Sequence, residues 1–464
     1  MKVLHVLANS PPDVNGYAVR TKMVLESIER NDIAQCVALT SPWYPDRDSM
    51  VESVEINKIL YHRTIHPSRK KNTRLSHKFV SFFTPKKSNS TKISEEVYPD
   101  RKNPIIRILH FFYFGIFKIG RLFRFYFKLL WKVIEEKILV KYFTKRIIQV
   151  ATESEVDIIH AHTPYRVGLP GLLAARKLKK PFVYEMRGIW EETAVANGRW
   201  SRNGPAYRRF QNLENKVLRK ADAVVCISQT LKNEAIKRGV YESKITVVTN
   251  AVNLSEDSLT LESEILGVAK DKLSQNEELV VGYIGSLRKM EGVDFTAQAV
   301  AKLVERGHNV QFFVLTGESG QAELKSYCEK LGIQDRSVIL GPVPHEEVKP
   351  FFDLIDIFVV SRPDSVVTRL VTPLKPFEAM AMGKTVVASD LPALREIISH
   401  NETGLLFEAE NLANLTDTIE SCIANEEMRH RLSKQALEFV NTERSWDKVT
   451  EEYRKMYSNL RKVR

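Results

Sequence analysis

The segment from Thr372 to Gly383 combines a helix pattern with charges that suit an anionic ligand. Thr372 fits the capping position before a helix, Pro373 fits the first helical position, and Gly383 fits the end. The free amides of a first helical turn bind anions such as a diphosphate, and Lys375 adds a positive charge there. Glu378 lies one turn further on, within reach of a sugar diol. An ordinary capped helix whose Lys375 and Glu378 face water is the alternative.

The loop after the first apolar run contains a second candidate group, made of Gly16, Tyr17 and Arg20. A glycine lets the backbone approach a phosphate or a sugar closely, although a plain turn would also use one. If Gly16 serves such an approach, Tyr17 and Arg20 face the same ligand. Residues 21–30 are then expected to form the helix that follows this loop.

Two histidines, His160 and His162, end the strand pattern DIIHAH. Strand alternation places both side chains on the same face. They could line a reaction site, or each could bond only to a neighbouring carbonyl. We expect no metal, because no further cluster of ligands accompanies the pair.

The motif YEMRGIWEE follows another strand pattern and offers polar groups and an aromatic ring to a ligand rich in hydroxyls. Arg187 and Glu191 could bind the hydroxyls of such a ligand, and Trp190 could stack on a sugar ring. Packing in the core is the alternative for Trp190. Asn250 falls where the two halves of the chain meet, so we expect it at a hinge rather than in the chemistry.

Strand and helix patterns alternate along the chain, which predicts an α/β protein with two doubly wound parallel sheets. We assign residues 1–252 to an N-terminal domain and residues 253–440 to a second domain. Residues 441–464 are expected to form a helix that crosses back to the first domain. Ligands of such folds bind at the carboxyl ends of the strands, here between the two domains.

The length of 464 residues suits two domains, and the composition, with 27% charged residues, is that of a globular protein. The four cysteines are far apart in sequence, which indicates free thiols and a reducing compartment. The opening run MKVLHVLANSPP is too short for a signal peptide and reads as a first strand. We therefore expect a cytoplasmic protein.

An insertion at about residues 64–150 interrupts the alternation of the first domain. Residues 64–104 are polar and basic and read as a mobile loop, whereas residues 105–148 read as helical and rich in aromatics. Residues 101–146 hold twelve Lys or Arg and two Glu, a net charge of +10 within the chain's +12. A stripe at helical spacing contains Lys118, Arg121, Arg124, Lys128 and Lys132.

This basic, aromatic insertion predicts binding to an anionic membrane surface through residues 105–148. The charges interrupt every apolar run long enough to span a bilayer. A helix packed on the first domain with solvated lysines is the alternative. Nucleic acid is not expected as a partner, because no nucleic-acid-binding module accompanies the charge.

An ordered set of motifs resembles the family 4 glycosyltransferases of the GT-B fold. The run PLKPFEAMAMGKTVVASDLPALRE is similar to their donor-binding region. The second half also offers GYIGSLRKMEGVD, VLTGESG, VILGPVPHEEVKPFFDLIDIFVVSR and NETGLLF. The first half offers NGYAVRT, HAHTPYRVGLPG, VYEMRGIWEE and VVTNAVN. The resemblance covers nearly the whole chain apart from about residues 64–150.

The resemblance implies sugar transfer from a nucleotide-diphosphate sugar to a glycan or lipid-linked acceptor, with retention and without a metal or other cofactor. Residues 1–252 would then form the acceptor-binding domain and residues 253–440 the nucleotide-sugar-binding domain. Cell-surface polysaccharide synthesis at the inner face of the cell membrane is the expected setting. His162 would line the reacting sugar and Glu378 would bind the donor ribose, with Lys375 as the third catalytic residue. The expected donor-binding residues are Gly16, Gly285, Ser286, Arg288, Gly317, Val343, Arg362, Thr372, Pro373 and Leu374. The expected acceptor-binding residues are Tyr17, Arg20, His160, Arg187, Trp190 and Glu191.

The chain departs from the family pattern at three positions. Leu370 stands eight positions before Glu378, where the family usually has an acid. Ser286 and Glu291 stand where Arg and Lys are common in the first loop of the second domain. We therefore expect the phosphate charge to be compensated by Lys375, assisted by Arg288 and by Arg362 or Arg369.

The missing acid at Leu370 supports one alternative function, a catalytically weak or inactive membrane-associated scaffold or nucleotide-sugar-binding protein of the same fold. A GT-B epimerase or phosphorylase is a further alternative. The epimerase would need a different set of carboxylates, and a phosphorylase usually has a much longer chain.

Overall fold

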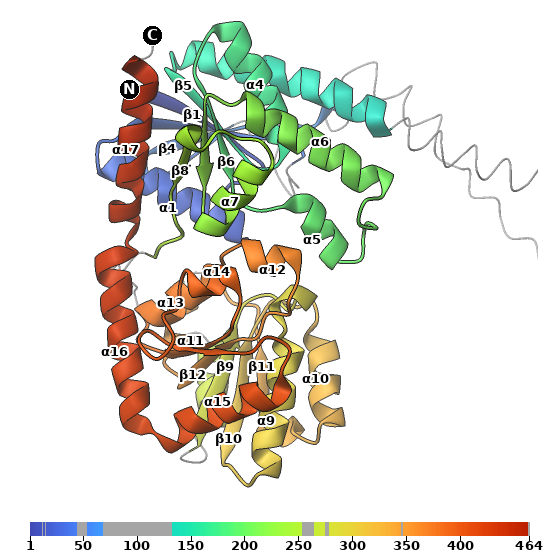
Figure 1. Ribbon diagram of the computed structural model, residues 1–464, viewed down its shortest axis with the longest axis vertical. Coiled ribbons are helices and arrows are strands. Elements are labelled where there is room, and N and C mark those ends of the chain that lie inside the picture. The colour runs from blue at the N-terminus through green and yellow to red at the C-terminus, as the bar shows by residue number, and fades with distance from the viewer. Residues whose placement is uncertain are drawn as a thin grey trace, which may run out of the picture.

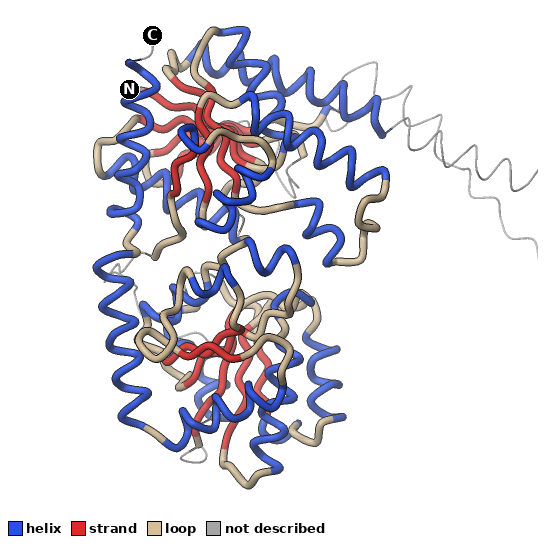
Figure 2. The backbone as a smooth tube through the Cα atoms, in the orientation of Figure 1, coloured by secondary structure: helices blue, strands red, loops and turns tan. Residues whose placement is uncertain are grey.

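The computed structural model describes residues 1–11, 13, 15–43, 53–67, 132–252, 264–273, 278–344 and 347–462. These residues form two α/β domains, one above the other in Figure 1, each with a central sheet and helices on both faces (Figure 2). The two doubly wound domains predicted from the alternation of patterns are therefore confirmed.

The first sheet has eight strands in the order β3-β4-β2-β1-β5-β6-β7-β8. Only β3 and β4 are antiparallel, joined by a tight turn at Asn57 and Lys58, whose φ angles are both positive. The strands are β1 (Lys2–Leu7), β2 (Gln35–Thr40), β3 (Ser53–Ile56), β4 (Ile59–Arg63), β5 (Ile158–His162), β6 (Phe182–Met186), β7 (Ala223–Cys226) and β8 (Ile245–Val247).

The helices of the first domain connect these strands. They are α1 (Gly16–Arg30), a helix over residues 132–153, α4 (Tyr165–Leu178), α5 (Trp190–Ala196), α6 (Pro205–Lys220) and α7 (Gln229–Lys237). Helix α1 begins five residues earlier than the sequence suggested, because the Asn15 side chain accepts hydrogen bonds from the amides of Tyr17 and Ala18. The placement of Gly16 and Tyr17 in a loop is therefore wrong.

The second sheet is entirely parallel, with the order β11-β10-β9-β12-β13-β14. Its strands are near-continuous apolar runs because helices cover both faces, as in β10, where every residue is buried. The strands are β9 (Leu279–Ile284), β10 (Val310–Leu315), β11 (Ser337–Leu340), β12 (Ile357–Val360), β13 (Thr385–Ser389) and β14 (Leu405–Phe407).

The second domain also contains a helix before its first strand. This helix, α8, packs Leu266, Ala269 and Leu273 into the core. The other helices are α9 (Val293–Glu305), α10 (Gln321–Lys330), α11 (Lys349–Phe352), α12 (Val366–Leu370), α13 (Lys375–Ala381), α14 (Pro392–Arg395), α15 (Leu412–Ala424) and α16 (Glu426–Glu443), with α8 spanning Glu264–Leu273.

The last two helices connect the two domains along one side of the molecule (Figure 1). Helix α16 packs against α13 in the second domain, and α17 (Trp446–Lys462) packs against α1 in the first. Three aromatic residues of α17 are buried in the first domain beside β1 and β5: Trp446, Tyr453 and Tyr457.

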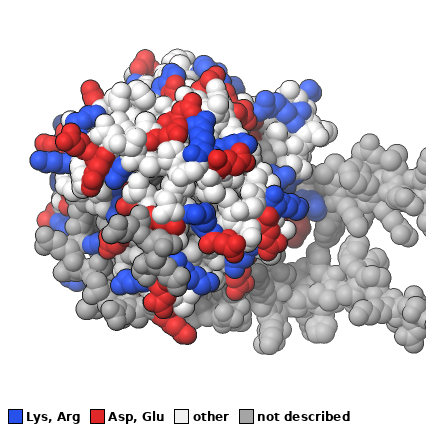
Figure 3. Space-filling model, turned by 90° about the horizontal axis from the view of Figure 1, so that it is seen from below, with Lys and Arg blue, Asp and Glu red and all other residues white. Residues whose placement is uncertain are grey.

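Most of the basic insertion, including Lys118, Arg121, Arg124 and Lys128, lies outside the described residues. Lys132 is the first described residue of the helix over residues 132–153, whose Phe143 and Ile147 are fully buried. Among the described residues, no helix combines the length and the apolar character needed to cross a bilayer. Seen from below, Lys and Arg alternate with Asp and Glu instead of gathering in one patch (Figure 3).

Glu214 on α6 makes the stability of the first domain depend on pH. Its carboxylate is buried, accepting hydrogen bonds from the Tyr184 hydroxyl and, at 2.7 Å, from the amide of Tyr165. Burial raises the pKa of Glu214 to about 7. A raised pKa in the folded state means that the stabilising contribution is present at low pH and is lost as the pH rises through about 7.

We expect Glu214→Gln to remove this dependence, because an amide does not titrate. Between pH 4.5 and pH 8, the free energy of unfolding of the wild type should fall by about 3 kcal/mol more than that of Glu214→Gln. This difference does not depend on the absolute stability of the variant. Urea unfolding at several pH values measures this difference. Parallel curves for the two proteins would show that Glu214 does not titrate in this range.

Candidate active site

The donor segment begins its helix later than the sequence predicted. Helix α13 starts at Lys375, with Leu374 before it and no side-chain cap, so the assignments of Thr372 as the cap and Pro373 as the first helical residue are wrong. Asn250 explains the delay, because its side-chain amide donates to the Thr372 carbonyl at 2.9 Å and to its hydroxyl at 3.2 Å. The predicted end is confirmed, since Gly383 follows the helix with a φ of 65°.

Lys375 lies against the loop that follows β9. A Cβ atom at Gly285 would come within 2.1 Å of Lys375 Cε, so only a glycine leaves room for this side chain. The ammonium group lies 5.4 Å from the centroid of the Tyr283 ring and 3.1 Å from Glu291 Oε2. Lys375 is thus held at the carboxyl end of the central strand of its sheet.

Glu291 is the centre of a cationic cluster that the sequence did not reveal. Arg288 Nη2 lies 2.8 Å from Glu291 Oε1, and Arg362 Nε lies 3.7 Å from Oε2, in addition to Lys375. Although burial acts to raise it, these three cations bring the pKa of Glu291 down to about 2. We call Lys375, Arg288, Arg362 and Glu291 the cationic cluster.

The structure places the remaining predicted phosphate contacts differently. Arg362 is buried and also donates to the Val371 carbonyl at 2.9 Å. Arg369 lies outside the cluster and pairs with Asp364 at the surface. Ser286 is exposed, and its carbonyl accepts a hydrogen bond from the Tyr283 hydroxyl at 3.1 Å.

The other predicted donor contacts line the carboxyl ends of the same sheet. Glu378 is partly buried one turn after Lys375. Burial raises the pKa of the Tyr283 hydroxyl, and the charges of Glu291 and then Glu378 add to that rise. Gly317 is exposed after β10 with open space where a side chain would begin. Val343 follows β11 and packs against the core of the second domain.

We expect Gly285→Ala to weaken donor binding, because the added methyl group would displace Lys375 from its position. A rise of about tenfold in the donor dissociation constant corresponds to one lost charge-assisted contact. Isothermal titration with the donor measures the change. Gly267→Ala is the matched control, because Gly267 on α8 has no atom within 4 Å of the added Cβ. Unchanged affinity in Gly285→Ala would contradict the role of this close contact.

The first domain contributes a buried polar cluster centred on Glu185 of β6. Glu185 Oε1 accepts hydrogen bonds from Arg187 Nε at 2.6 Å and from Arg20 Nε at 3.4 Å. The Tyr453 hydroxyl donates to Oε2 at 2.7 Å. Burial opposes ionisation of Glu185, but Arg187 and then His162 bring its pKa well below the usual range.

The predicted histidines both face Glu185, which confirms that they share one side of β5. His160 Nε2 and His162 Nδ1 lie 3.3 Å and 3.5 Å from Glu185 Oε2. His160 is completely buried and its Nδ1 lies 2.7 Å from the Tyr457 hydroxyl, so in this structure its side chain offers no surface to an acceptor. His162 Nε2 shares a hydrogen bond of 3.1 Å with Nδ1 of His5 on β1.

His5 makes a third histidine that the sequence search for metal ligands overlooked. The ring nitrogens of His5, His160 and His162 lie within 4.8 Å of one another. The guanidinium groups of Arg20 and Arg187 are buried in the same cluster, with Glu185 beside them. A divalent cation added there would face two cations and one carboxylate in a desolvated environment, which is unfavourable.

Tyr17 lies beside the Glu185 cluster, where its carbonyl accepts a hydrogen bond from Arg187 Nη1 at 3.2 Å. Its ring lies 5.7 Å from that of Trp190, and its hydroxyl would be 2.9 Å from a Cβ at Gly188. Burial raises the pKa of Tyr17 to about 12, and the charges of Arg187 in the first domain and Arg288 in the second oppose that rise. Tyr17 is therefore influenced by charges from both domains.

The other acceptor candidates are held by protein contacts to different degrees. Arg187 Nη1 donates to Thr21 Oγ1 at 2.6 Å, whereas Arg187 Nη2 has no hydrogen-bond partner among the described residues. Glu191 is fully buried and pairs with Arg238 at 2.7 Å. Gly16 has open space where a side chain would begin.

Contacts between the domains surround this site. Leu370 packs against the core of the first domain, and its carbonyl accepts a hydrogen bond from Thr230 Oγ1 at 3.0 Å. The Glu396 carboxylate accepts from the amides of Gln229 and Thr230, both at 2.7 Å, at the start of α7. Asn250, predicted at a hinge, bridges from Arg20 Nη1 at 2.7 Å to Thr372.

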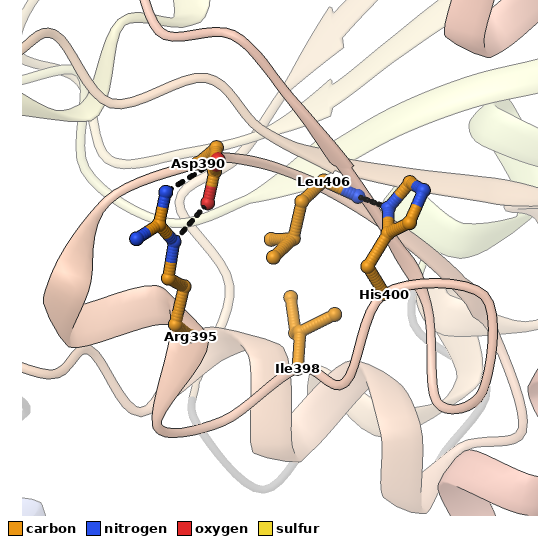
Figure 4. Close-up of a pocket in the computed structure, with 5 residues that line it drawn as sticks. All are labelled: Asp390, Arg395, Ile398, His400 and Leu406. Carbon is orange, nitrogen blue, oxygen red and sulfur yellow. Dashed lines mark hydrogen bonds and ion pairs between the residues drawn. The ribbon is translucent and has the colours of Figure 1, made fainter.

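A separate pocket of about 440 Å³ lies at the edge of the second sheet (Figure 4). The side chains of Asp390 and Arg395 pair across one side of it, and the Leu406 amide donates to His400 Nδ1 at 3.0 Å. None of the predicted site residues lines this pocket.

Comparison with known proteins shows which family has this arrangement. The chain matches Glycosyltransferase Family 4 over residues 79–256 and Glycosyl transferases group 1 over residues 268–439. It is 24% identical over 310 residues to the alpha-monoglucosyldiacylglycerol synthase of Streptococcus pneumoniae, covering 66% of this chain and 68% of that one. It is 23% identical over 309 residues to a capsular polysaccharide biosynthesis glycosyltransferase of Staphylococcus aureus, covering 66% and 77%.

The fold comparison agrees with the sequence comparison. HepE from Anabaena, solved in complex with UDP, superimposes with a TM-score of 0.65 at 15% identity, covering 99% of this chain and all of that one. The predicted GT-B architecture and the resemblance to family 4 are both confirmed. The protein is a glycosyltransferase with the GT-B fold and belongs to glycosyltransferase family 4.

Proposed function

We propose that the protein transfers a sugar from a nucleoside-diphosphate sugar to a glycan or lipid-linked acceptor, with retention of the anomeric configuration. The observation that carries this proposal is the cationic cluster beside Gly285. Its three cations and one carboxylate leave two positive charges in excess, which matches the two negative charges of a diphosphate. HepE, a protein of the same fold, was solved with UDP, which supports a donor of this class.

The cluster suits the departure of a diphosphate. Negative charge develops on the leaving group during transfer, and preorganised cations stabilise it most where water is excluded. The side chain of Lys375 is 17% exposed and that of Arg288 is 52% exposed. Arg362 is only 3% exposed, but its guanidinium also donates to the Val371 carbonyl, so Lys375 is the best placed of the three to reach a ligand. Glu378 follows on the same helix and is proposed to bind the donor ribose.

The acceptor side is proposed to lie against Tyr17, Arg187, Trp190 and His162. Arg187 Nη2 is buried and has no hydrogen-bond partner among the described residues, so an acceptor oxygen could pair with it once a shift of neighbouring side chains opens the site. Burial lowers the pKa of His162 well below its usual value, so the ring is neutral at pH 7 and can accept or donate a hydrogen bond. We propose front-face displacement without a covalent intermediate.

No metal or other cofactor is proposed to take part, since the cationic cluster can supply the charge that a divalent ion supplies elsewhere. Transfer assayed with EDTA, and again with added Mg²⁺ or Mn²⁺, tests this. Equal rates are expected. A rate that depends on the ion would reject this part of the proposal.

A screen of nucleotide-sugars by thermal shift tests donor binding. We expect one family among the UDP-, GDP-, ADP- and CMP-sugars to raise the melting temperature, and the corresponding free nucleoside to raise it less. A scaffold that retains the fold is the alternative, and the apolar Leu370 in place of an acid favours it. Slow hydrolysis of the bound donor separates the two, because a scaffold would bind the donor without cleaving it.

The proposed place of action is the inner face of the cell membrane, in the synthesis of a cell-surface polysaccharide. The names of the two relatives, a glucosyldiacylglycerol synthase and a capsular polysaccharide enzyme, support such acceptors. The helix over residues 132–153 exposes Ile134 and Ile138, at 39% and 55%, with Lys137 and Lys141 exposed beside them. Exposed apolar side chains flanked by lysines suit an anionic lipid surface.

Co-sedimentation with vesicles tests the membrane proposal. The deletion should span residues 68–131 only, because Phe143 and Ile147 in the following helix belong to the core of the first domain. Wild type is expected to bind anionic vesicles more than zwitterionic ones. The deletion variant should bind the anionic vesicles less, and Ile138→Glu should weaken binding further. Equal sedimentation of all three proteins would overturn the membrane proposal and leave the donor proposal intact.

A further inference from the structure

We propose that Tyr453 of α17 is a positioning residue for His162, acting through Glu185. The inference rests on the proposed function, in which His162 lines the reacting sugar. Helix α17 follows the second domain in sequence but packs in the core of the first domain, next to the proposed reaction site. None of the motifs that identify the site includes this helix.

The contacts of Glu185 Oε2 carry the proposal. Three groups share this oxygen: the Tyr453 hydroxyl at 2.7 Å, His160 Nε2 at 3.3 Å and His162 Nδ1 at 3.5 Å. The Tyr453 contact is the shortest of the three and has the geometry of a full hydrogen bond. Arg187 Nε holds Oε1 of the same carboxylate at 2.6 Å, and Tyr453 holds Oε2, the oxygen that faces His162.

Tyr453 is itself held rigidly. Its side chain is completely buried and its ring is stacked on Tyr457 with centroids 5.8 Å apart. Earlier in the same helix, Trp446 lies under the guanidinium of Arg20 at 5.1 Å. A positioning residue needs such support, because a mobile residue behind the reacting group would leave that group poorly oriented.

Helix α17 also links this cluster to the donor side. It follows α16, which packs against α13, and α13 contains Lys375 and Glu378. The donor helix and Glu185 are thus both in contact with one continuous pair of helices. A shift of α16 and α17 would therefore displace the donor helix α13 and Glu185 at the same time.

The tyrosine hydroxyl also controls the charge that His162 experiences. His162 faces Glu185 and Arg187 from β6, His160 from β5, His5 from β1, and Arg20 from α1. Without the hydroxyl, Glu185 Oε2 would have only the two histidines as partners. Its negative charge would then favour protonated His162, and the pKa of His162 would rise.

Tyr453→Phe tests the proposal, with Tyr457→Phe as the matched control. Both variants lose one buried hydroxyl from the same face of α17, but the Tyr457 hydroxyl contacts His160 rather than Glu185. In Tyr453→Phe we expect kcat to fall about tenfold, with an unchanged donor dissociation constant. The acid limb of the rate profile should move to higher pH in this variant alone.

A second measurement does not depend on activity. The ¹⁵N resonances of the His162 ring, assigned by comparison with His162→Gln, report its protonation as the pH is lowered. Protonation at a higher pH in Tyr453→Phe than in Tyr457→Phe and the wild type is expected. Identical titration in all three, or equal loss of kcat in both tyrosine variants, would overturn the positioning role. Absence of transfer in the wild type would instead reject the proposed function, and the ring titration would still decide the structural claim.

Discussion

Lys375→Ala is expected to raise the donor dissociation constant by about 10- to 100-fold, the equivalent of one strong charge-assisted contact. The loss leaves Glu291 with Arg288 and Arg362 alone, so the excess positive charge of the cationic cluster falls by half. Arg288→Ala removes the same formal charge. Its effect should be smaller, at most about fivefold, because the half-exposed guanidinium is screened by water.

Isothermal titration of the wild type and both variants with the same donor measures the three dissociation constants and shows which variant binds the donor more weakly. Lys384→Ala is the matched control, because it removes a lysine just after the other end of α13. Affinity close to that of the wild type is expected for the control. Equal effects of Lys375→Ala and Arg288→Ala would show that Lys375 is not the main phosphate contact.

Glu185→Ala is expected to lower the free energy of unfolding of the first domain by about 3–5 kcal/mol, the range for breaking a buried ion pair. The carboxylate is completely buried between Arg20 and Arg187, which are themselves buried. Its removal leaves two desolvated cations without their counter-charge. The Tyr453 hydroxyl would also lose its acceptor.

Urea unfolding followed by tryptophan fluorescence measures this loss. Glu192→Ala is the control, because Glu192 is also a buried carboxylate of the first domain. Its partners are Arg202, which is half exposed and can be hydrated, and the Tyr207 hydroxyl at 2.6 Å, so no buried cation loses its counter-charge. A smaller decrease of about 1–2 kcal/mol is expected for the control. If the two variants unfold at the same urea concentration, the Glu185 cluster contributes no special stability.

The sequence predicted the fold better than it predicted the contacts within the site. The runs of β9 and β10 are apolar apart from Gln311, and such runs separated by helix patterns have few alternatives to a parallel sheet. The start of α13 was misplaced because Thr372 is held by Asn250, a residue 122 positions away. Local propensity does not contain that information.

The cationic cluster and the Glu185 cluster also depend on contacts that local sequence does not predict. Glu291 was recognised as an unusual residue, but only the fold shows that it gathers Lys375, Arg288 and Arg362. Glu185 could have been noticed, since a lone carboxylate within the apolar strand FVYEM requires partners. Those partners include Tyr453, which is 268 positions further along the chain. No pattern of spacing connects residues so far apart.

The return of α17 to the first domain has a consequence for the protein during synthesis. The core of that domain includes Trp446, Tyr453 and Tyr457, which leave the ribosome roughly 200 residues after the last strand of the first sheet. At translation rates of about 5–20 residues per second, the domain waits for some 10–40 s with one side uncovered. The first domain is thus the first to be translated and the last to be completed. A nonsense mutation near residue 445 would leave the second sheet intact and the first domain exposed to chaperones and proteases.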